Sequence, residues 1–289
     1  MNKLGYVRIM TATPELKVAN CTYNSERICS LIDQAEAQGC DLLVLPELCT
    51  TGYTCGDLFL HKTLLDASDR GLLSIAAATT DKSVIVVAGA PIRGNSGVLY
   101  NCAAILCGGE VQAFVPKCNL PNYGEFAEMR YFTEFDPESK EQYLSFAGEE
   151  IPVGSYVFQV EGGALPYRFG VEICEDLWVP NPPGIALSQM GAQIIVNLSA
   201  NNETIGKDEA RRRRVAPERR QRAAVLPQPR RRNGRCGACD HRKRSEARAH
   251  GAWRCAGAAA CHPLHGDHQP RMPAPLPQGR KAGSGHQRC

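Results

Sequence analysis

Short apolar segments alternate with amphipathic ones along the first two thirds of the chain. After its leading Asp, segment 41–45 is a continuous apolar run, typical of a strand buried on both faces. Segment 21–38 repeats its apolar residues at helical spacing and ends at Gly39, a residue type that commonly terminates helices. The same criteria predict strands over residues 6–12, 41–45, 84–88, 99–107, 111–115, 156–160, 168–173 and 193–198, and helices over 21–38, 64–78 and 183–190.

The connections between these segments favour a mixed sheet over a purely parallel one. Gly108 and Gly109 separate two strand segments and form a hairpin signal, so we expect these two strands to be antiparallel. Elsewhere strands alternate with helices, an order that places helices on the faces of a sheet. The prediction is an α/β fold with a mixed sheet covered by helices.

Composition and charge divide the chain near residue 211. Residues 1–210 carry 13 Lys and Arg against 26 Asp and Glu, whereas residues 211–289 carry 20 against 4, although the net charge of the whole chain is only +3. The second region contains no Ile, Phe or Tyr. It therefore has too little apolar surface to offset the conformational entropy of ordering, about 1–2 kcal/mol per residue. We predict a folded domain over residues 1–210 and a basic, disordered tail over 211–289.

Three interpretations of the tail are open. Its arginine clusters resemble phosphate-binding patches, although aromatic residues for base stacking are nearly absent. Cys236 and Cys239 have the spacing of a zinc ligand pair, but no second pair repeats it. The abundance of Arg, Ala, Gly, Pro and Cys is typical of a GC-rich coding region read out of frame. We favour this last hypothesis, in which the authentic sequence ends near residues 207–213.

The lengths of the apolar segments limit the class of protein. The longest apolar runs have strand length, far short of the about 18–20 residues of a membrane helix. The first ten residues lack the apolar region and cleavage site of a secretory signal. We therefore expect a cytoplasmic protein without a membrane partner, whose 14 cysteines are mostly reduced thiols.

Three reactive side chains each follow a predicted strand. Cys174 stands where strand 168–173 runs into a turn, a place where a sheet holds a nucleophile rigidly. Its acidic neighbours disfavour a thiolate, so a reactive Cys174 requires a cation from elsewhere in the chain. Lys117 is the candidate cation, and Glu47 is the candidate general base. Taken singly, each has an ordinary alternative: a buried thiol, a solvated loop charge or a helix cap.

Together these residues and their surroundings resemble a known family. The blocks Leu45-Pro46-Glu47-Leu48, Lys117 with Leu120-Pro121, Glu172-Ile173-Cys174-Glu175-Asp176 and Asn197-Leu198-Ser199 follow the order of the nitrilase, or carbon–nitrogen hydrolase, superfamily. Blocks 52–59, 122–132, 170–180 and 203–207 narrow the resemblance to the amidase domains of bacterial glutamine-dependent NAD synthetases. The resemblance covers about residues 1–211.

The resemblance implies a fold and a set of roles. The fold is a four-layer αββα sandwich, and the site is a triad in which Glu47 is the general base, Lys117 the oxyanion-stabilising ammonium and Cys174 the nucleophile, without a metal. Glu125 is expected to be the second carboxylate, which orients the site. The positions that the resemblance assigns to glutamine binding are Tyr53, Tyr123, Phe126, Glu175, Asn201 and Lys207, with Asn201 standing where a small serine is expected.

The resemblance also implies chemistry outside this sequence. In that family, ammonia passes to a synthetase domain that uses ATP and Mg²⁺ to amidate nicotinic acid adenine dinucleotide. The Ser-Gly-Gly-x-Asp-Ser pyrophosphate loop of that domain is missing here. We expect glutamine as substrate, no cofactor for its hydrolysis, no specific nucleic acid partner, and homo-oligomers of the full-length enzyme. We expect the sandwich to be truncated, and hence a poorly soluble, nearly inactive chain.

Two alternative functions are open. The first is a stand-alone carbon–nitrogen hydrolase acting on another amide or on a nitrile, against which block 122–132 argues. The second is nucleic acid binding through the basic tail, which predicts steeply salt-dependent binding that is lost with residues 211–289.

Overall fold

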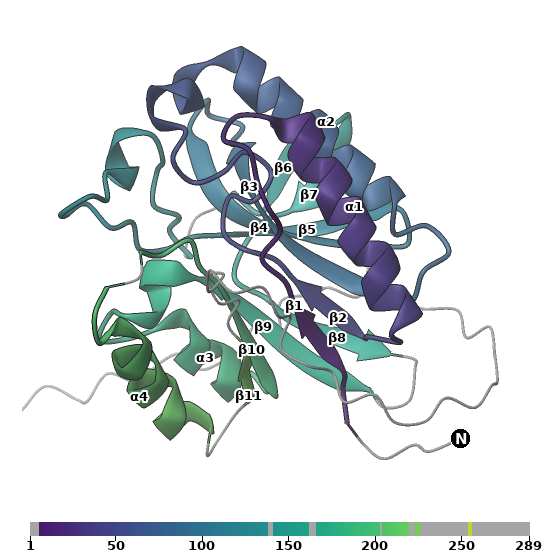
Figure 1. Cartoon of the computed structure of the whole chain (residues 1–289), viewed down its shortest axis with the longest axis vertical. Helices are drawn as coiled ribbons and strands as arrows, with labels where there is room; N and C mark the ends of the chain where they lie inside the picture. Colours follow the sequence, from purple (N-terminus) through teal and green to yellow (C-terminus); the bar gives the residue numbers. More distant parts are fainter. Residues whose placement is uncertain are drawn as a thin grey trace, which may run out of the picture.

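Two five-stranded sheets, packed face to face, form the centre of the molecule (Figure 1). The computed structural model describes residues 6–137, 141–161, 166–202, 204–219, 223–225 and 254–255. The strands are β1 (Ile9–Thr11), β2 (Leu42–Val44), β3 (Ile85–Arg93), β4 (Leu99–Cys107), β5 (Glu110–Pro116), β6 (Tyr143–Phe146), β7 (Glu149–Pro152), β8 (Val157–Glu161), β9 (Tyr167–Ile173), β10 (Ile194–Leu198), β11 (Ala223–Val225) and β12 (Arg254–Cys255). The α-helices are α1 (Cys21–Ala37), α2 (Lys62–Ala77), α3 (Pro183–Gln189) and α4 (Lys207–Arg219), and the 3₁₀ helices are η1 (Gly56–Leu60), η2 (Glu128–Arg130) and η3 (Cys174–Leu177).

Both sheets mix parallel and antiparallel pairs. The first has the order β1-β2-β3-β4-β5, in which β1, β2 and β3 are parallel and β4 is antiparallel to its two neighbours. The second has the order β11-β10-β9-β8-β12. In it, β9, β10 and β11 are parallel, β8 is antiparallel to β9, and β12 is antiparallel to β8. The predicted hairpin at Gly108 and Gly109 is confirmed, since both glycines have positive φ in the turn between β4 and β5.

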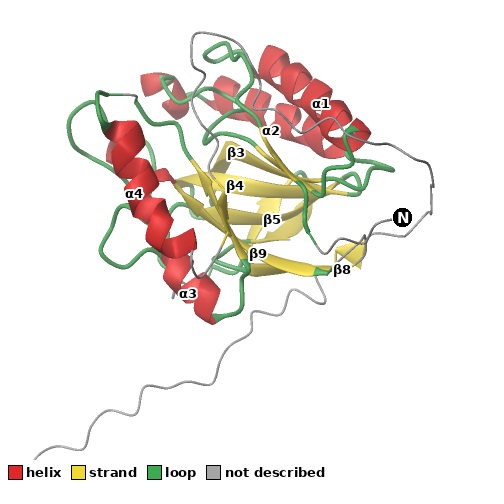
Figure 2. Cartoon of the chain, turned by 60° about the horizontal axis from the view of Figure 1, so that its bottom comes forward, coloured by secondary structure: helices red, strands yellow, loops and turns green. Residues whose placement is uncertain are grey.

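Helices on the two outer faces complete a four-layer arrangement. Helices α1 and α2 cover the first sheet, while α3 and α4 lie on the far side of the second (Figure 2). A buried apolar cluster between the sheets includes Leu42, Ile105 and Phe169, and a second cluster joins Ile28 and Ile75 of the helices to the first sheet. The predicted α/β fold is confirmed, and the single sheet that periodicity suggested is two sheets, as the αββα resemblance implies.

The change in composition near residue 211 does not coincide with the end of regular structure. Helix α4 begins at Lys207 and continues to Arg219, with acidic residues in its first turn, where the helix dipole favours them. Ion pairs at i,i+4 spacing join Asp208 to Arg212 and Glu209 to Arg213. Helix α4 leads to β11, which pairs in parallel with β10. Strand β12 is also described and pairs with β8. The other positions of the predicted disordered tail after residue 219, including the zinc candidates Cys236 and Cys239, lie outside the described residues.

The length and hydropathy of the helices bear on whether they could cross a bilayer. None of those in the described part of the chain is both long and apolar enough to span a membrane.

Candidate active site

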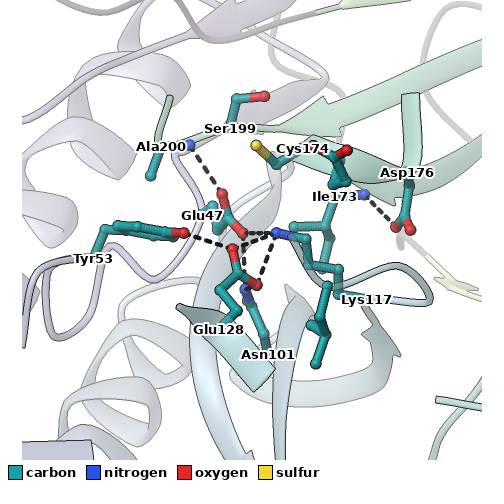
Figure 3. Close-up of polar contacts among 12 residues, drawn as sticks. Glu47, Tyr53, Asn101, Lys117, Glu128, Ile173, Cys174, Asp176, Ser199 and Ala200 are labelled. Carbon is teal, nitrogen blue, oxygen red and sulfur yellow. Dashed lines mark hydrogen bonds and ion pairs between the residues drawn. The ribbon is translucent and has the colours of Figure 1, made fainter. Parts of the chain in front are cut away.

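The structure brings Glu47, Lys117 and Cys174 together between the two sheets (Figure 3). Glu47 lies three residues after β2, Lys117 follows β5 directly and Cys174 follows β9 directly. All three are buried, with exposed fractions of 2%, 1% and 4%. Strand ends from both sheets therefore supply the site, and the sheet interiors hold their side chains in place.

A close backbone approach positions Glu47. The turn at residues 46–48 lies directly against Gly89 of β3, where an added Cβ would be 2.2 Å from the Leu48 nitrogen and 2.6 Å from the Pro46 oxygen. Leu48 itself has a φ of +50°, an unfavourable value for a residue with a side chain. Only glycine therefore fits at position 89 if the turn is to keep its place.

The backbone is also strained at Cys174. Its φ is +47°, a left-handed conformation that costs a residue other than glycine about 1–3 kcal/mol and that clusters at functional sites. The turn is held on its two sides by side chains: Asp176 accepts a hydrogen bond from the Ile173 N–H at 3.0 Å, and Asn197 donates to the Cys174 carbonyl at 3.5 Å. The nucleophile candidate thus occupies a conformation that its surroundings impose.

One ammonium group bridges two buried carboxylates. The Lys117 Nζ donates to Glu47 Oε1 at 2.6 Å and to both oxygens of Glu128 at 2.7 and 2.9 Å. Tyr53 donates its hydroxyl to Glu128 at 2.6 Å, and Asn101 donates its amide to Glu47 at 2.8 Å. Each charged group in this charge cluster, which we define as Glu47, Lys117 and Glu128, therefore has hydrogen-bond partners within the protein, and one ammonium is shared by two carboxylates.

The second carboxylate is Glu128, and the prediction that Glu125 takes this place is corrected. Glu128 is 3% exposed and opens η2, whereas Glu125 is exposed and accepts a hydrogen bond from Asn202. The chain folds back between them, since the Glu128 N–H donates to the Pro121 carbonyl. Both residues stand in one short block, so spacing from Lys117 alone does not reveal which one turns inward.

Two partners of Glu47 were missed by sequence reasoning. Asn101 donates to Glu47 Oε1, and its backbone carbonyl accepts from the Lys117 N–H at 2.8 Å. The Ala200 N–H donates to the other oxygen, Oε2, at 3.0 Å. A signal for Asn101 was present, because it is the one strongly polar residue in the otherwise apolar segment 99–107. A backbone donor such as Ala200 leaves no such signal.

The electrostatics of the site keep the thiol protonated and the lysine charged. Burial raises the pKa of Cys174 above its ordinary value, and the Glu47 carboxylate raises it further, while Lys117 opposes both. Burial lowers the pKa of Lys117, but Glu47, Cys174 and Glu128 outweigh burial and raise it. Burial and Glu47 raise the pKa of Glu128. A reaction at the sulfur therefore requires a base that accepts its proton, and Glu47 is in place for this (Figure 3).

Aromatic residues predicted to line the pocket lie together. The Phe126 ring makes edge-to-face contacts with Tyr53 and Tyr123, with ring centroids 6.2 and 5.7 Å apart. The Tyr123 hydroxyl donates to Glu175 at 2.9 Å, one residue after the nucleophile candidate. Tyr53 extends inward to Glu128, so this group reaches from the charge cluster to the surface.

The two remaining predicted pocket residues, Asn201 and Lys207, follow the C-terminal end of β10 and lie next to the aromatic group. Lys207 donates to Asn201 at 2.6 Å and also to Asn202. Its ammonium lies 5.9 Å from the Phe126 ring centre. We call the outer residues of this group, which lie on loops or in the first turns of η3 and α4, the rim: Tyr123, Glu125, Glu175, Asn201, Asn202 and Lys207. Asn201 thus contacts Lys207 from the position where the resemblance suggested a serine.

Side chains that commonly bind metal ions are scattered rather than clustered into a ligand set in the described residues. No group of three or more His, Cys, Asp or Glu side chains is arranged to hold a metal ion within the residues that the structure describes.

Comparison with known proteins assigns the chain to a family. A family model described as carbon-nitrogen hydrolase matches residues 7–217, and the chain belongs to this family. It is 32% identical over 208 residues to a glutamine-dependent NAD(+) synthetase of Mycobacterium tuberculosis, covering 72% of this chain and 30% of that protein. It is 34% identical over 222 residues to a protein of the same name from Xylella fastidiosa, covering 76% and 36%.

A solved structure gives the same result. The chain is similar to the crystal structure of a glutamine-dependent NAD(+) synthetase from Cytophaga hutchinsonii, with a TM-score of 0.66 and 29% identity, over 76% of this chain and 35% of that one. The chain therefore spans about a third of the length of each of these three relatives.

Proposed function

We propose that this chain hydrolyses the side-chain amide of glutamine and corresponds to the ammonia-releasing part of a glutamine-dependent NAD(+) synthetase. The observation that carries the proposal is the buried charge cluster beside Cys174, in which Lys117 contacts both Glu47 and Glu128. The names of the relatives support glutamine as the source of the amide and NAD(+) as the product of the longer enzymes.

In the first step, the Cys174 sulfur attacks the amide carbon while Glu47 accepts the thiol proton. Glu47 Oε1 already accepts from Lys117 and Asn101, whereas Oε2 accepts only the Ala200 N–H, so Oε2 is the better proton acceptor. Glu47 then returns the proton to the nitrogen, ammonia leaves, and a thioester remains on the sulfur. Water, deprotonated by Glu47, hydrolyses the thioester to glutamate and the free thiol.

Lys117 supplies the positive charge beside which the tetrahedral oxyanion forms. Removing one such donor typically lowers the rate by about 10²–10³-fold. Glu128 and Tyr53 fix the ammonium from the opposite side, because Glu128 accepts from both residues. Burial strengthens these interactions, since the effective dielectric constant is lower than in water.

The hydrolysis needs no cofactor in this scheme. We propose that the ammonia is consumed in an ATP- and Mg²⁺-dependent amidation by a region that lies outside this chain in the longer relatives. The rim is proposed to bind the amino acid end of glutamine, with the Lys207 ammonium for its carboxylate and the Glu175 carboxylate for its ammonium.

Covalent labelling tests the proposal even if turnover is slow. The chain is incubated with a diazoketone analogue of glutamine, and the labelled cysteine is identified by peptide mass spectrometry. We expect labelling of Cys174 that glutamine suppresses, and no ammonia release from glutamine by Cys174→Ala. Cys118→Ala, a change at the half-buried thiol next to Lys117, is the matched control and retains both activities. Labelling that glutamine does not suppress, or faster hydrolysis of a different amide, would contradict glutamine as the substrate.

A further inference from the structure

Asp176 is a buried carboxylate that the proposed chemistry does not use. It is 1% exposed and lies in η3, two residues after Cys174. Its Oδ2 accepts the Ile173 N–H at 3.0 Å, and its Oδ1 accepts both the N–H and the side-chain amide of Asn119, at 2.9 and 2.8 Å. Three donors therefore converge on one side chain within the interior.

These contacts join the two loops that carry the reacting groups. Ile173 ends β9 in the second sheet and directly precedes the nucleophile candidate. Asn119 lies two residues after Lys117, in the loop that leaves β5 of the first sheet. The described hydrogen bonds of Asp176 therefore connect the loop after β5 with the turn after β9. The bond to the Ile173 N–H closes the strained turn at Cys174.

We propose that Asp176 is a positioning residue that sets the separation between the Lys117 ammonium and the Cys174 thiol. If this separation grows, the thiol loses the cation that favours its ionised form, and it becomes harder to deprotonate. The catalytic meaning of the proposal rests on the proposed function, whereas the ionisation of the thiol is measurable without glutamine.

Asp176→Asn separates this role from a purely electrostatic one. The substitution preserves the volume, but its NH₂ group must face either the Ile173 N–H or the two Asn119 donors, so the link to one loop is lost. Removing a negative charge near a thiol, by itself, makes the thiol easier to ionise. Unfolding also makes it easier, because it removes the burial that raises the pKa of Cys174. Only a change of position makes ionisation harder.

The sequence provides a clean readout. Trypsin cleavage after Arg168 and Lys207 releases the peptide 169–207, in which Cys174 is the sole cysteine. The rate of iodoacetamide alkylation of this peptide's cysteine is measured in the intact chain between about pH 6 and pH 10, a range over which the thiolate fraction rises with pH. We expect Asp176→Asn to slow alkylation about tenfold at a given pH, equivalent to a thiol pKa about one unit higher.

Two further variants keep the test decisive. Ser83→Ala removes the hydrogen bonds from the Ser83 hydroxyl to Glu36 of α1, which involve neither loop nor the turn that carries Glu47, and is expected to leave alkylation of Cys174 unchanged. Asn119→Ala removes only one of the three hydrogen bonds to Asp176, and we expect about twofold to threefold slower alkylation from this milder loss. If Asp176→Asn does not fold, the alkylation rate of Asn119→Ala tests the proposal in its place.

Unchanged or faster alkylation in folded Asp176→Asn, or in Asn119→Ala if Asp176→Asn does not fold, would overturn the proposal. Since no glutamine is present, this result is independent of the labelling experiment that tests the proposed function.

Discussion

The charge cluster and the rim belong to one site but are built by opposite means. Glu47, Lys117 and Glu128 are nearly inaccessible and contact one another, with Glu47 and Lys117 placed just after strands and Glu128 at the start of η2. The rim lies on loops and at helix starts, and its Tyr123 is 58% exposed. We therefore expect substitutions in the charge cluster to change stability and the reactivity of Cys174, and substitutions in the rim to change ligand binding.

The comparison is tested most strongly by removing the same charge from each region. Lys117→Met leaves two buried carboxylates without a cation, so we expect the free energy of unfolding to fall by about 3–5 kcal/mol. Labelling of Cys174 should slow by about 10²–10³-fold. Lys207→Met is the matched control on the rim, where we expect a change in stability within about 0.5 kcal/mol. Equal destabilisation in denaturant titrations of both variants would remove the distinction.

The pH dependence sharpens the comparison within the buried region. Burial raises the pKa of Asp176 to about 6, against hydrogen bonds from Asn119 and Ile173 and the charge of Lys117. The folded chain therefore holds this proton more tightly than the unfolded chain. Its contribution to stability, at most about 3 kcal/mol, is present at low pH and lost as the pH rises through about 6. The nearby thiol of Cys118, whose own pKa Asp176 raises, stays neutral in this range.

Activity is expected to follow the opposite trend. Protonated Asp176 has lost part of its capacity to accept hydrogen bonds from Asn119 and Ile173, so labelling of Cys174 should decline as the pH falls below about 6. The measurement compares unfolding free energies and labelling rates of the wild type and Asp176→Asn across this range. A labelling rate that declines with the same pH dependence in both proteins would show that another group is responsible.

The smallest expected effects come from two tyrosine hydroxyls. Tyr123→Phe removes a hydrogen bond to Glu175 on the exposed rim, and we expect up to about tenfold weaker binding of the glutamine analogue with little change in stability. Tyr53→Phe removes a donor from buried Glu128, and we expect a stability loss of about 1–3 kcal/mol. Binding titrations and denaturant unfolding distinguish them, and similar stability losses in both variants would contradict the contrast.

The fold was largely predictable because burial sets the period of apolar residues. Strand β4 has the predicted bounds of 99–107, and helix α1 ends one residue before the predicted end. The hairpin of β6 and β7 was missed, since each strand has four residues and the connection is too short to show a period. The division into two sheets was available only through the family resemblance, because local patterns contain no information on which distant strands pair.

The position of a side chain was predictable where the residue closely follows a strand, as Glu47, Lys117 and Cys174 do. It was not predictable where a loop folds back, as with Glu128 and Glu125, because the direction of a side chain in a loop depends on tertiary contacts. The contribution of Asn101 was visible only as a polar residue in an apolar strand.

The close backbone contact at Gly89 has a consequence for engineering this scaffold. The turn that carries Glu47 rests on the main chain of β3, with backbone hydrogen bonds from Leu45 to Val87 and from Thr50 to Gly89 on either side. A side chain added at position 89 would collide with this backbone, and repacking of neighbouring side chains cannot relieve such a collision. A change of side-chain volume within an apolar core, by contrast, is often accommodated by repacking. Changes to the rim therefore leave this alignment untouched, whereas the crossing of β3 with this turn must be kept intact in any redesign.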